Sequence, residues 1–115
     1  MNKASKASLA AAALLIAALP AAAQNKGDPA AGEQKSSMCV GCHNIPGYKT
    51  AFPLVYSVPK LDGQHPAYIV NALKAYKAGD RKHPSMRAVA ASLSEQDMAD
   101  LAAFFSRPQT QQASR

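Results

Sequence analysis

The chain has 115 residues, a length typical of one domain, so a second independently folded unit is not expected. It contains 13 Lys and Arg against seven Asp and Glu, a formal net charge of +6, and only two cysteines. Because both cysteines lie in one short motif, a long-range disulfide framework is excluded. The positive charge indicates a nucleic acid, an anionic lipid surface or an acidic protein surface as the binding partner.

Residues 1–23 have the layout of a secretory signal peptide. Lys3 and Lys6 precede an apolar run at 9–19, and three small residues follow at 21–23. The run is mostly alanine and much shorter than the roughly 20 apolar residues that span a bilayer, so we expect cleavage rather than a membrane anchor. Export makes nucleic acid the least favoured of the three partners.

Cleavage before Gln24 leaves one domain over residues 24–108 and a polar tail over residues 109–115. This mature chain carries 11 basic and seven acidic residues, a net charge of +4, and no later segment that could cross a membrane. A chain of this size buries only a limited core, so small exported proteins commonly add a disulfide, a metal or a cofactor.

The first helix is expected to begin at Asp28 and Pro29, an N-cap carboxylate followed by a proline at the first helical position. The carboxylate stabilises such a helix because it accepts a hydrogen bond from a free N–H group of the first turn. The helix would run over residues 30–38 and deliver Cys39 and Cys42 into the turn that follows.

Residues 44–62 contain three prolines and one glycine without a helical period, which indicates an ordered loop. The loop offers apolar side chains for packing: Phe52, Leu54, Val55, Tyr56 and Val58. Their β-branched and aromatic character also allows a short strand over residues 54–58, although no pairing partner is obvious.

Pro66 opens a second helix, in which Ile69, Leu73 and Tyr76 recur at spacings of four and three and mark one buried stripe. Gly79 ends this helix, since glycine readily adopts the left-handed conformation that closes one. A polar stretch with one proline then separates it from the next element.

Residues 86–93 form a short helical segment, and Ser94 with Asp97 predicts a capping box at the start of the last helix. Pro108 closes this helix. Its buried stripe consists of Met98, Leu101, Ala102 and Phe105. The whole pattern predicts an all-α domain with three main helices joined by loops.

Cys39, Cys42 and His43 form a Cys-x-x-Cys-His motif. Two thiols one helical turn apart can each add to a vinyl group of haem, and the histidine after them can ligate the iron. A redox Cys-x-x-Cys would be expected near a βαβ unit, and a zinc site would need four ligands, whereas His65 and His83 lie apart without a second paired motif. The motif therefore predicts one covalently attached haem c.

Over residues 28–105 the chain resembles the class I bacterial c-type cytochromes, both the single-haem type and one half of the related two-haem proteins. The resemblance rests on the haem motif, on residues 59–64, which match a Pro-x-Leu-x-Gly pattern, and on Met86 followed by the Asp97-centred last helix. The loop between the first two pieces departs from the family, because it is longer and more aromatic. The resemblance implies a small all-α cytochrome c fold wrapped around the haem, in the periplasm.

A second axial ligand would close the iron site and favour electron transfer over the binding of small molecules. Met86 lies in an irregular segment, far enough from His43 for the chain to pass round the haem edge, and cytochromes c favour methionine as this ligand. His83 is the alternative and would give a lower potential. Three other donors fit other roles: Met38 lies beside the covalent tether, Met98 fills the core, and His65 ends a loop or caps a helix.

The resemblance also implies that the carbonyl of Pro59 accepts a hydrogen bond from His43, which would orient the ring and raise its basicity. Leu61 would pack on the haem beside Pro59. Other candidates for the haem wall are Ile69, Leu73, Val89 and Phe105.

Because no nucleophile has a companion base nearby in the sequence, we expect an electron carrier rather than an enzyme. A basic cluster indicates either a solvated helix face or a docking surface for acidic redox partners: Lys74, Lys77, Arg81, Lys82 and Arg87. Three functions stay open: a free periplasmic shuttle, a cytochrome subunit of a dehydrogenase complex with residues 47–58 as its interface, and a ligand-binding haem with an open sixth position.

Overall fold

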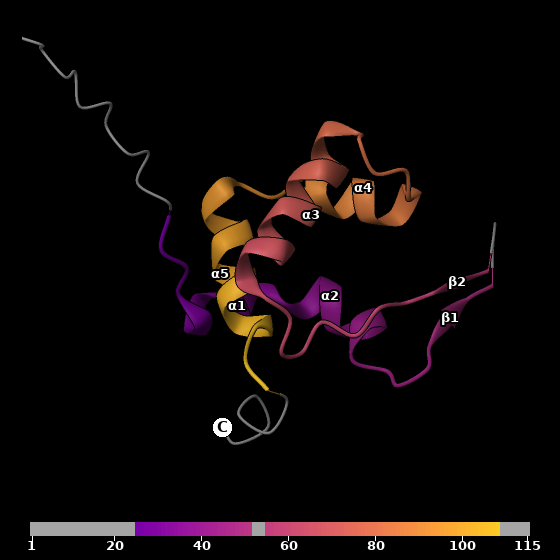
Figure 1. Ribbon diagram of the computed structural model, residues 1–115, viewed down its shortest axis with the longest axis horizontal. Helices are drawn as coiled ribbons and strands as arrows, with labels where there is room; N and C mark the ends of the chain where they lie inside the picture. The colour runs from indigo at the N-terminus through magenta and orange to yellow at the C-terminus, as the bar shows by residue number, and fades with distance from the viewer. Residues whose placement is uncertain (1–24, 52–54, 109–115) are drawn as a thin grey trace, which may run out of the picture.

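The computed structural model describes residues 25–51 and 55–108, in which five α-helices and one short β-hairpin are arranged as in Figure 1. The predicted signal peptide at 1–23 and polar tail at 109–115 lie outside these residues, as do Phe52 and Leu54. The described part is mostly helical, which confirms the all-α prediction. None of its helices is both long enough and apolar enough to cross a bilayer.

The first predicted helix is divided into α1 (Pro29–Lys35) and α2 (Ser37–His43). α1 begins as expected, with the carboxylate of Asp28 accepting the N–H of Ala30 at 2.9 Å. The prediction that Cys39 and Cys42 lie in a turn after this helix is wrong, because both are part of α2.

Ser36 causes the division between α1 and α2. Its side chain and its backbone N–H both donate to the carbonyl of Glu33, at 2.7 and 3.2 Å, which tightens the end of α1. The carbonyl of Ser36 then accepts the N–H groups of Cys39 and Val40 and starts α2. Ser36 is also buried, so this break lies inside the molecule.

α1 and the residues just before it cross α5 (Glu95–Phe105) at very short range, and one glycine in each permits the approach. A Cβ atom on Gly32 would lie 2.0 Å from the carbonyl oxygen of Asp100, and one on Gly27 would lie 2.0 Å from that of Ala99. Only a residue without a side chain fits at either position.

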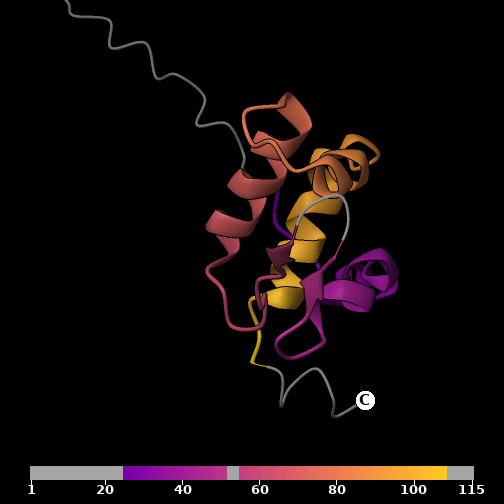
Figure 2. The ribbon, with the colours of Figure 1, turned by 90° about the vertical axis from the view of Figure 1, so that its right-hand side faces the viewer.

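The start of α5 confirms the predicted capping box. The hydroxyl of Ser94 accepts the N–H of Asp97 at 3.1 Å, and the carboxylate of Asp97 accepts the N–H of Ser94 at 2.9 Å. α5 lies between α3 (Pro66–Ala78) and the segment formed by α1 and α2 (Figure 2). The core sits where these helices meet, and Met98 belongs to it with 1% of its surface exposed.

α3 has the predicted start and end, with Pro66 in its first turn and Gly79 at φ 89° as its C-cap. α4 (Pro84–Ala91) packs against α3 and begins two residues earlier than expected. Met86 therefore lies in the first turn of a helix, and the prediction that it occupies an irregular segment is wrong. The cause is His83, whose side chain caps a helix that Pro84 opens.

The loop before α3 contains an antiparallel hairpin of β1 (Lys49–Thr50) and β2 (Tyr56–Ser57), where an ordered loop without strand pairing was expected. Its register pairs Thr50 with Tyr56, and Gly47 with φ 68° turns the chain before it. The alternative of a strand within residues 54–58 is thus confirmed at its centre. The hairpin extends away from the helices (Figure 1), and its Val55 is 70% exposed rather than packed.

Candidate haem site

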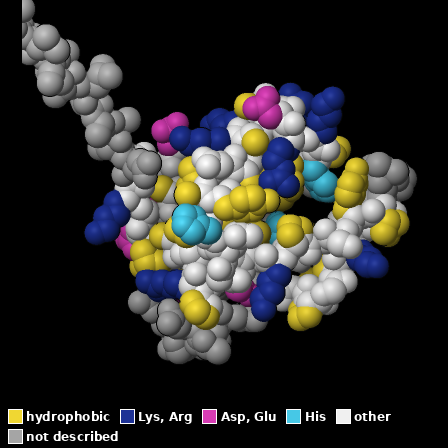
Figure 3. All heavy atoms as spheres, in the orientation of Figure 1, with side chains coloured by type: hydrophobic (Ala, Val, Ile, Leu, Met, Phe, Trp, Pro, Cys, Tyr) yellow, Lys and Arg dark blue, Asp and Glu magenta, His cyan; other side chains and the backbone are white. Residues whose placement is uncertain are grey.

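A cavity of about 690 Å³ opens between the hairpin and the helices α2, α3 and α4. Its volume lies within the range of cofactor pockets, roughly 300–1,000 Å³. Figure 3 shows an opening between the hairpin and the helical body, with hydrophobic and histidine side chains at its edge. Every residue that the sequence proposed for the site lines this cavity: Cys39, Cys42, His43, Pro59, Leu61 and Met86.

The proposed wall residues also face the cavity, namely Ile69, Leu73, Val89 and Phe105. Tyr68 and Ala72 line it too, although the sequence reasoning missed them. Tyr68, Ala72 and Tyr76 are each four residues apart, so they lie on one face of α3. This helical spacing could have identified Tyr68 and Ala72 from the sequence. Tyr56 was also missed as a cavity residue, because its place depends on the hairpin.

The two cysteines are three positions apart on α2, so they are neighbours on one helix surface. Neither forms a disulfide; Cys39 is half-buried and Cys42 is exposed. Burial raises the pKa of the Cys39 thiol, and the neighbouring Cys42 raises it further. A redox-active Cys-x-x-Cys requires the opposite, a lowered pKa, so the site does not favour dithiol chemistry.

His43 is oriented by the loop that leads into α3. Its Nδ1 atom lies 2.7 Å from the carbonyl oxygen of Pro59. A carbonyl oxygen only accepts hydrogen bonds, so Nδ1 must carry the proton and donate it. Nε2 of a neutral imidazole then keeps the lone pair with which histidine binds a metal.

His83 has the opposite arrangement. Its Nδ1 atom accepts the backbone N–H of Met86 at 3.4 Å, so this nitrogen supplies the lone pair. In a neutral ring the proton is then on Nε2, which leaves that atom unable to bind a metal. The thioether of half-buried Met86, three residues further on, remains available at the cavity.

The other sulfur and nitrogen donors are placed less well for ligation. Met98 is buried in the core, and His65 is the N-cap residue of α3 without a side-chain capping bond; neither lines the cavity. Met38 does line it, on the same helix as the cysteines, and is 56% exposed. In residues 25–51 and 55–108, no three His, Cys, Asp or Glu side chains are grouped as a metal cluster.

Parts of the basic cluster already have partners in the protein. Lys74 pairs with Glu95 at 3.2 Å, and Lys77 donates to the carbonyl of Leu93. The guanidinium of Arg81 lies 4.6 Å from the centre of the Tyr76 ring. Arg81 and Lys82 line the cavity, whereas Arg87 lies beside Gly79.

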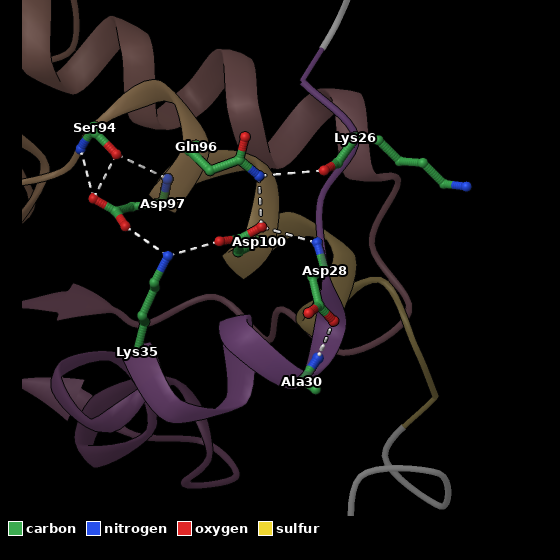
Figure 4. Close-up of polar contacts among 8 residues, drawn as sticks. All are labelled: Lys26, Asp28, Ala30, Lys35, Ser94, Gln96, Asp97 and Asp100. Carbon is green, nitrogen blue, oxygen red and sulfur yellow. Dashed lines mark hydrogen bonds and ion pairs between the residues drawn. The ribbon is translucent and has the colours of Figure 1, made fainter.

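A polar network fastens the segment before α2 to α5 (Figure 4). Asp100, with 3% of its surface exposed, accepts the N–H of Asp28 at 2.8 Å and the ammonium of Lys35 at 2.6 Å. Gln96 also donates to Asp100 and to the carbonyl of Lys26, at 2.8 and 3.2 Å. These contacts hold α1 and the residues before it against α5, and α1 leads directly into the helix that carries both cysteines.

The same network shifts the pKa values of its charged groups. Burial alone would raise the pKa of Asp100, but the bonds from Asp28, Lys35 and Gln96 outweigh it and lower that pKa. Lys35, 2.7 Å from Asp97, lowers the pKa of Asp97 with help from Ser94. Asp100 and then Asp97 raise the pKa of Lys35, so all three groups stay charged at neutral pH.

The residues at the cavity fit a haem c. Two free thiols lie on one helix, an imidazole nitrogen keeps its lone pair, and a thioether and a largely apolar wall lie in the same cavity. These are the attachment and ligand types that haem proteins of this kind use.

Comparison with known proteins also points to a protein that carries haem c. The family model described as cytochrome c matches residues 29–107. Cytochrome c-554(548) of Halomonas halodenitrificans is 42% identical over 83 residues, which cover 70% of this chain and 95% of that protein. Cytochrome c4 of Thiocapsa roseopersicina is 42% identical over 92 residues, 78% of this chain and 45% of that protein.

Cytochrome c4 of Pseudomonas aeruginosa is 37% identical over 92 residues, which cover 80% of this chain and 44% of that protein. The chain therefore spans less than half the length of these two cytochrome c4 relatives. The family model and the Halomonas protein, in contrast, are matched over most of the domain. The chain thus belongs to the cytochrome c family, as a class I bacterial c-type cytochrome that carries one covalently bound haem c and transfers electrons.

Proposed function

We propose that the protein is a periplasmic one-electron carrier whose haem c is attached at Cys39 and Cys42 and ligated by His43 and Met86. The observation that carries the proposal is the contrast between His43 and His83. The first ring keeps Nε2 for a metal, whereas the second uses its lone pair on the backbone at Met86.

The thiols of Cys39 and Cys42 would each add S–H across a vinyl group, so that a carbon–sulfur bond forms and the proton moves to the neighbouring carbon without net oxidation. An ordinary cysteine thiol is protonated at neutral pH, and burial raises the pKa of the Cys39 thiol further. When bound, the haem supplies one reversible Fe(III)/Fe(II) couple, whose potential a methionine ligand raises.

Ligation by both His43 and Met86 would leave no position for an exogenous ligand, which favours a carrier over a ligand-binding or peroxidatic protein. Carbon monoxide binding to the reduced protein tests this directly. We expect slow and incomplete binding, limited by release of Met86. Rapid and complete binding at neutral pH would show an open sixth position and contradict the proposal.

Electron exchange would take place at the mouth of the cavity. Arg81 and Lys82 line the cavity and are exposed, and their positive charge supports docking of partners with acidic surfaces. Lys74 and Lys77 contribute less to such a surface, because each already has an acceptor within the protein.

A subunit role in a dehydrogenase complex is the alternative, and the hairpin is the observation that favours it. Val55, Tyr48 and Tyr56 are 70%, 36% and 38% exposed on this projecting element, an apolar surface suited to a permanent partner. Purification from the native periplasm separates the two roles. A carrier elutes alone, whereas a subunit elutes with its dehydrogenase.

The periplasmic location depends on residues 1–23 acting as a signal peptide. The layout of these residues supports export, as does haem attachment after translocation in the family that the chain resembles. Intact-mass measurement of the secreted protein tests it, with a mature N-terminus at Gln24 as the expected result. A mature chain that retains the apolar run at 9–19 would contradict cleavage.

A further inference from the structure

His83 lies where α4 and the hairpin meet at the cavity. It precedes α4, its carbonyl accepts the N–H of Arg87 at 2.8 Å, and its ring accepts the N–H of Met86. From the other side, the Tyr56 ring of β2 contacts the imidazole, with centroids 4.7 Å apart and an interplanar angle of 64°. The ring is therefore held between the hairpin and the helix.

We propose that His83 is a positioning residue for the sixth ligand: its imidazole caps α4 and so fixes the backbone from which the thioether of Met86 enters the cavity. The inference rests on the proposed ligation by Met86. It assigns a role to His83 in place of the ligand role that the sequence left open, and a role to the hairpin that departs from the family pattern.

The cap matters because the N–H groups in the first turn of α4 have few other partners. The helix has only eight residues, and its first turn contains no acidic residue that would stabilise the free N–H groups. Pro84 has no N–H, so the N–H of Met86 is one of the few that need a partner there. Without the imidazole, this turn frays more often, and the thioether moves with it.

Tyr56 makes the cap more effective because it restricts the imidazole. An edge-on aromatic contact favours one orientation of the two rings. Tyr56 is itself held by pairing of β2 with β1, and its N–H donates to the side chain of Thr50 at 3.2 Å. The hairpin thus braces the imidazole, and through it the backbone at Met86.

The test compares His83→Ala with His83→Asn in the haem-loaded protein. Asparagine is a good N-cap residue but cannot replace a histidine ligand, so it separates capping from ligation. Two rates are measured: hydrogen exchange of the Met86 amide and carbon monoxide binding to the reduced protein. In His83→Ala we expect both to rise about fivefold, the factor that corresponds to a typical cap. In His83→Asn both should stay within about twofold of wild type.

Ser94→Ala is the matched control, since it removes the N-cap of α5 rather than that of α4. It should lower stability without faster carbon monoxide binding. Tyr56→Ala should shift both rates in the same direction as His83→Ala, but by less. Unchanged rates in His83→Ala, equal rates in His83→Ala and His83→Asn, or the same acceleration in Ser94→Ala would each overturn the inference.

Met86→Ala separates failure of this inference from failure of the proposed function. If Met86→Ala opens the haem to carbon monoxide while His83→Ala behaves as wild type, only the positioning role is wrong. If Met86→Ala binds carbon monoxide no faster than wild type while His83→Ala and His83→Asn both bind it rapidly, His83 is the ligand and both proposals are wrong.

Discussion

Nδ1 of His43 lies 2.7 Å from the carbonyl oxygen of Pro59, sixteen positions further along the chain. This one contact decides which ring nitrogen carries the proton, and therefore which one can bind iron. The same hydrogen bond makes the imidazole a stronger electron donor to a metal, because an acceptor at Nδ1–H raises the basicity of Nε2.

Pro59→Gly should therefore raise the reduction potential modestly. The carbonyl remains, but without the proline ring its backbone is freer and the bond to His43 is weaker. If the hydrogen bond contributes about 1 kcal/mol and loses about half of that, the reduction potential rises by roughly 20 mV for a one-electron couple. Pro46→Gly, in the same loop but away from the cavity, is the control in equilibrium redox titrations. Equal shifts in both variants would mean that the bond to Pro59 has no special effect.

The pair Gly32 and Gly41 tests the packing of α1 against α5. Gly32→Ala places a Cβ atom 2.0 Å from a backbone carbonyl, so the helices must separate, and we expect a loss of about 3 kcal/mol in the free energy of unfolding. Gly41→Ala meets no atom within 4 Å and should be neutral or stabilise α2 by up to about 1 kcal/mol. Denaturant unfolding measures both, and a Gly32→Ala protein as stable as wild type would refute the close crossing.

The buried carboxylate of Asp100 should matter more than an exposed one. Asp100→Ala leaves the N–H of Asp28 without its acceptor and Lys35 without one of its two partners. We expect a loss of about 2 kcal/mol in the free energy of unfolding, against less than about 0.5 kcal/mol for Asp80→Ala at the surface. Similar small losses in both variants would mean that the network contributes little.

The same network predicts how stability depends on pH. Because the pKa values of Asp97 and Asp100 are lowered on folding, the unfolded chain takes up their protons first. Their stabilisation is complete above the ordinary carboxyl pKa near 4 and is lost as the pH falls through the lowered values. Unfolding monitored from pH 6 to pH 2 should show a steeper decline in wild type than in Asp100→Ala. Parallel curves would contradict the lowered pKa of Asp100.

Docking through Arg81 and Lys82 predicts a strong dependence of electron-transfer rates on salt. Arg81→Gln and Lys82→Gln should each slow the reaction with an acidic redox partner by roughly threefold at low ionic strength, with little effect at high salt. Lys26→Gln removes a charge that does not line the cavity and serves as the control. A flat ionic-strength profile for wild type would show that positive charge does not guide docking.

The helices with clear start and stop signals could be predicted from the sequence. Asp28 with Pro29, Pro66 with Gly79, and the capping box at Ser94 all act through bonds within a few residues, so local pattern was enough. The break at Ser36 was missed because it depends on a bond from its hydroxyl to Glu33, and a serine inside a helix can also point to solvent or bond elsewhere. A strand within residues 54–58 was offered as an alternative, but its pairing was missed because the partner strand, Lys49–Thr50, is short and polar.

The identities of the site residues could be predicted from the sequence better than their detailed surroundings. The motif and the family resemblance named Cys39, Cys42, His43 and Met86, which all line one cavity. The resemblance implied the hydrogen bond from His43 to the Pro59 carbonyl, and the structure contains it. The proton position on His83 was not predicted, since it depends on the N–H of Met86, which meets the ring only once α4 has formed. The need for glycine at position 32 likewise appears only when α5 lies against it.

The most direct test of the account is the spectrum of the oxidised Met86→Ala protein. Ligation by Met86 would give the wild-type protein a weak sulfur-to-iron band near the red end of the visible range. We predict that Met86→Ala loses this band and binds carbon monoxide rapidly when reduced, while the haem stays covalently attached at Cys39 and Cys42. A band that persists unchanged in Met86→Ala would contradict the assignment of Met86, and with it the case for a closed, two-ligand carrier.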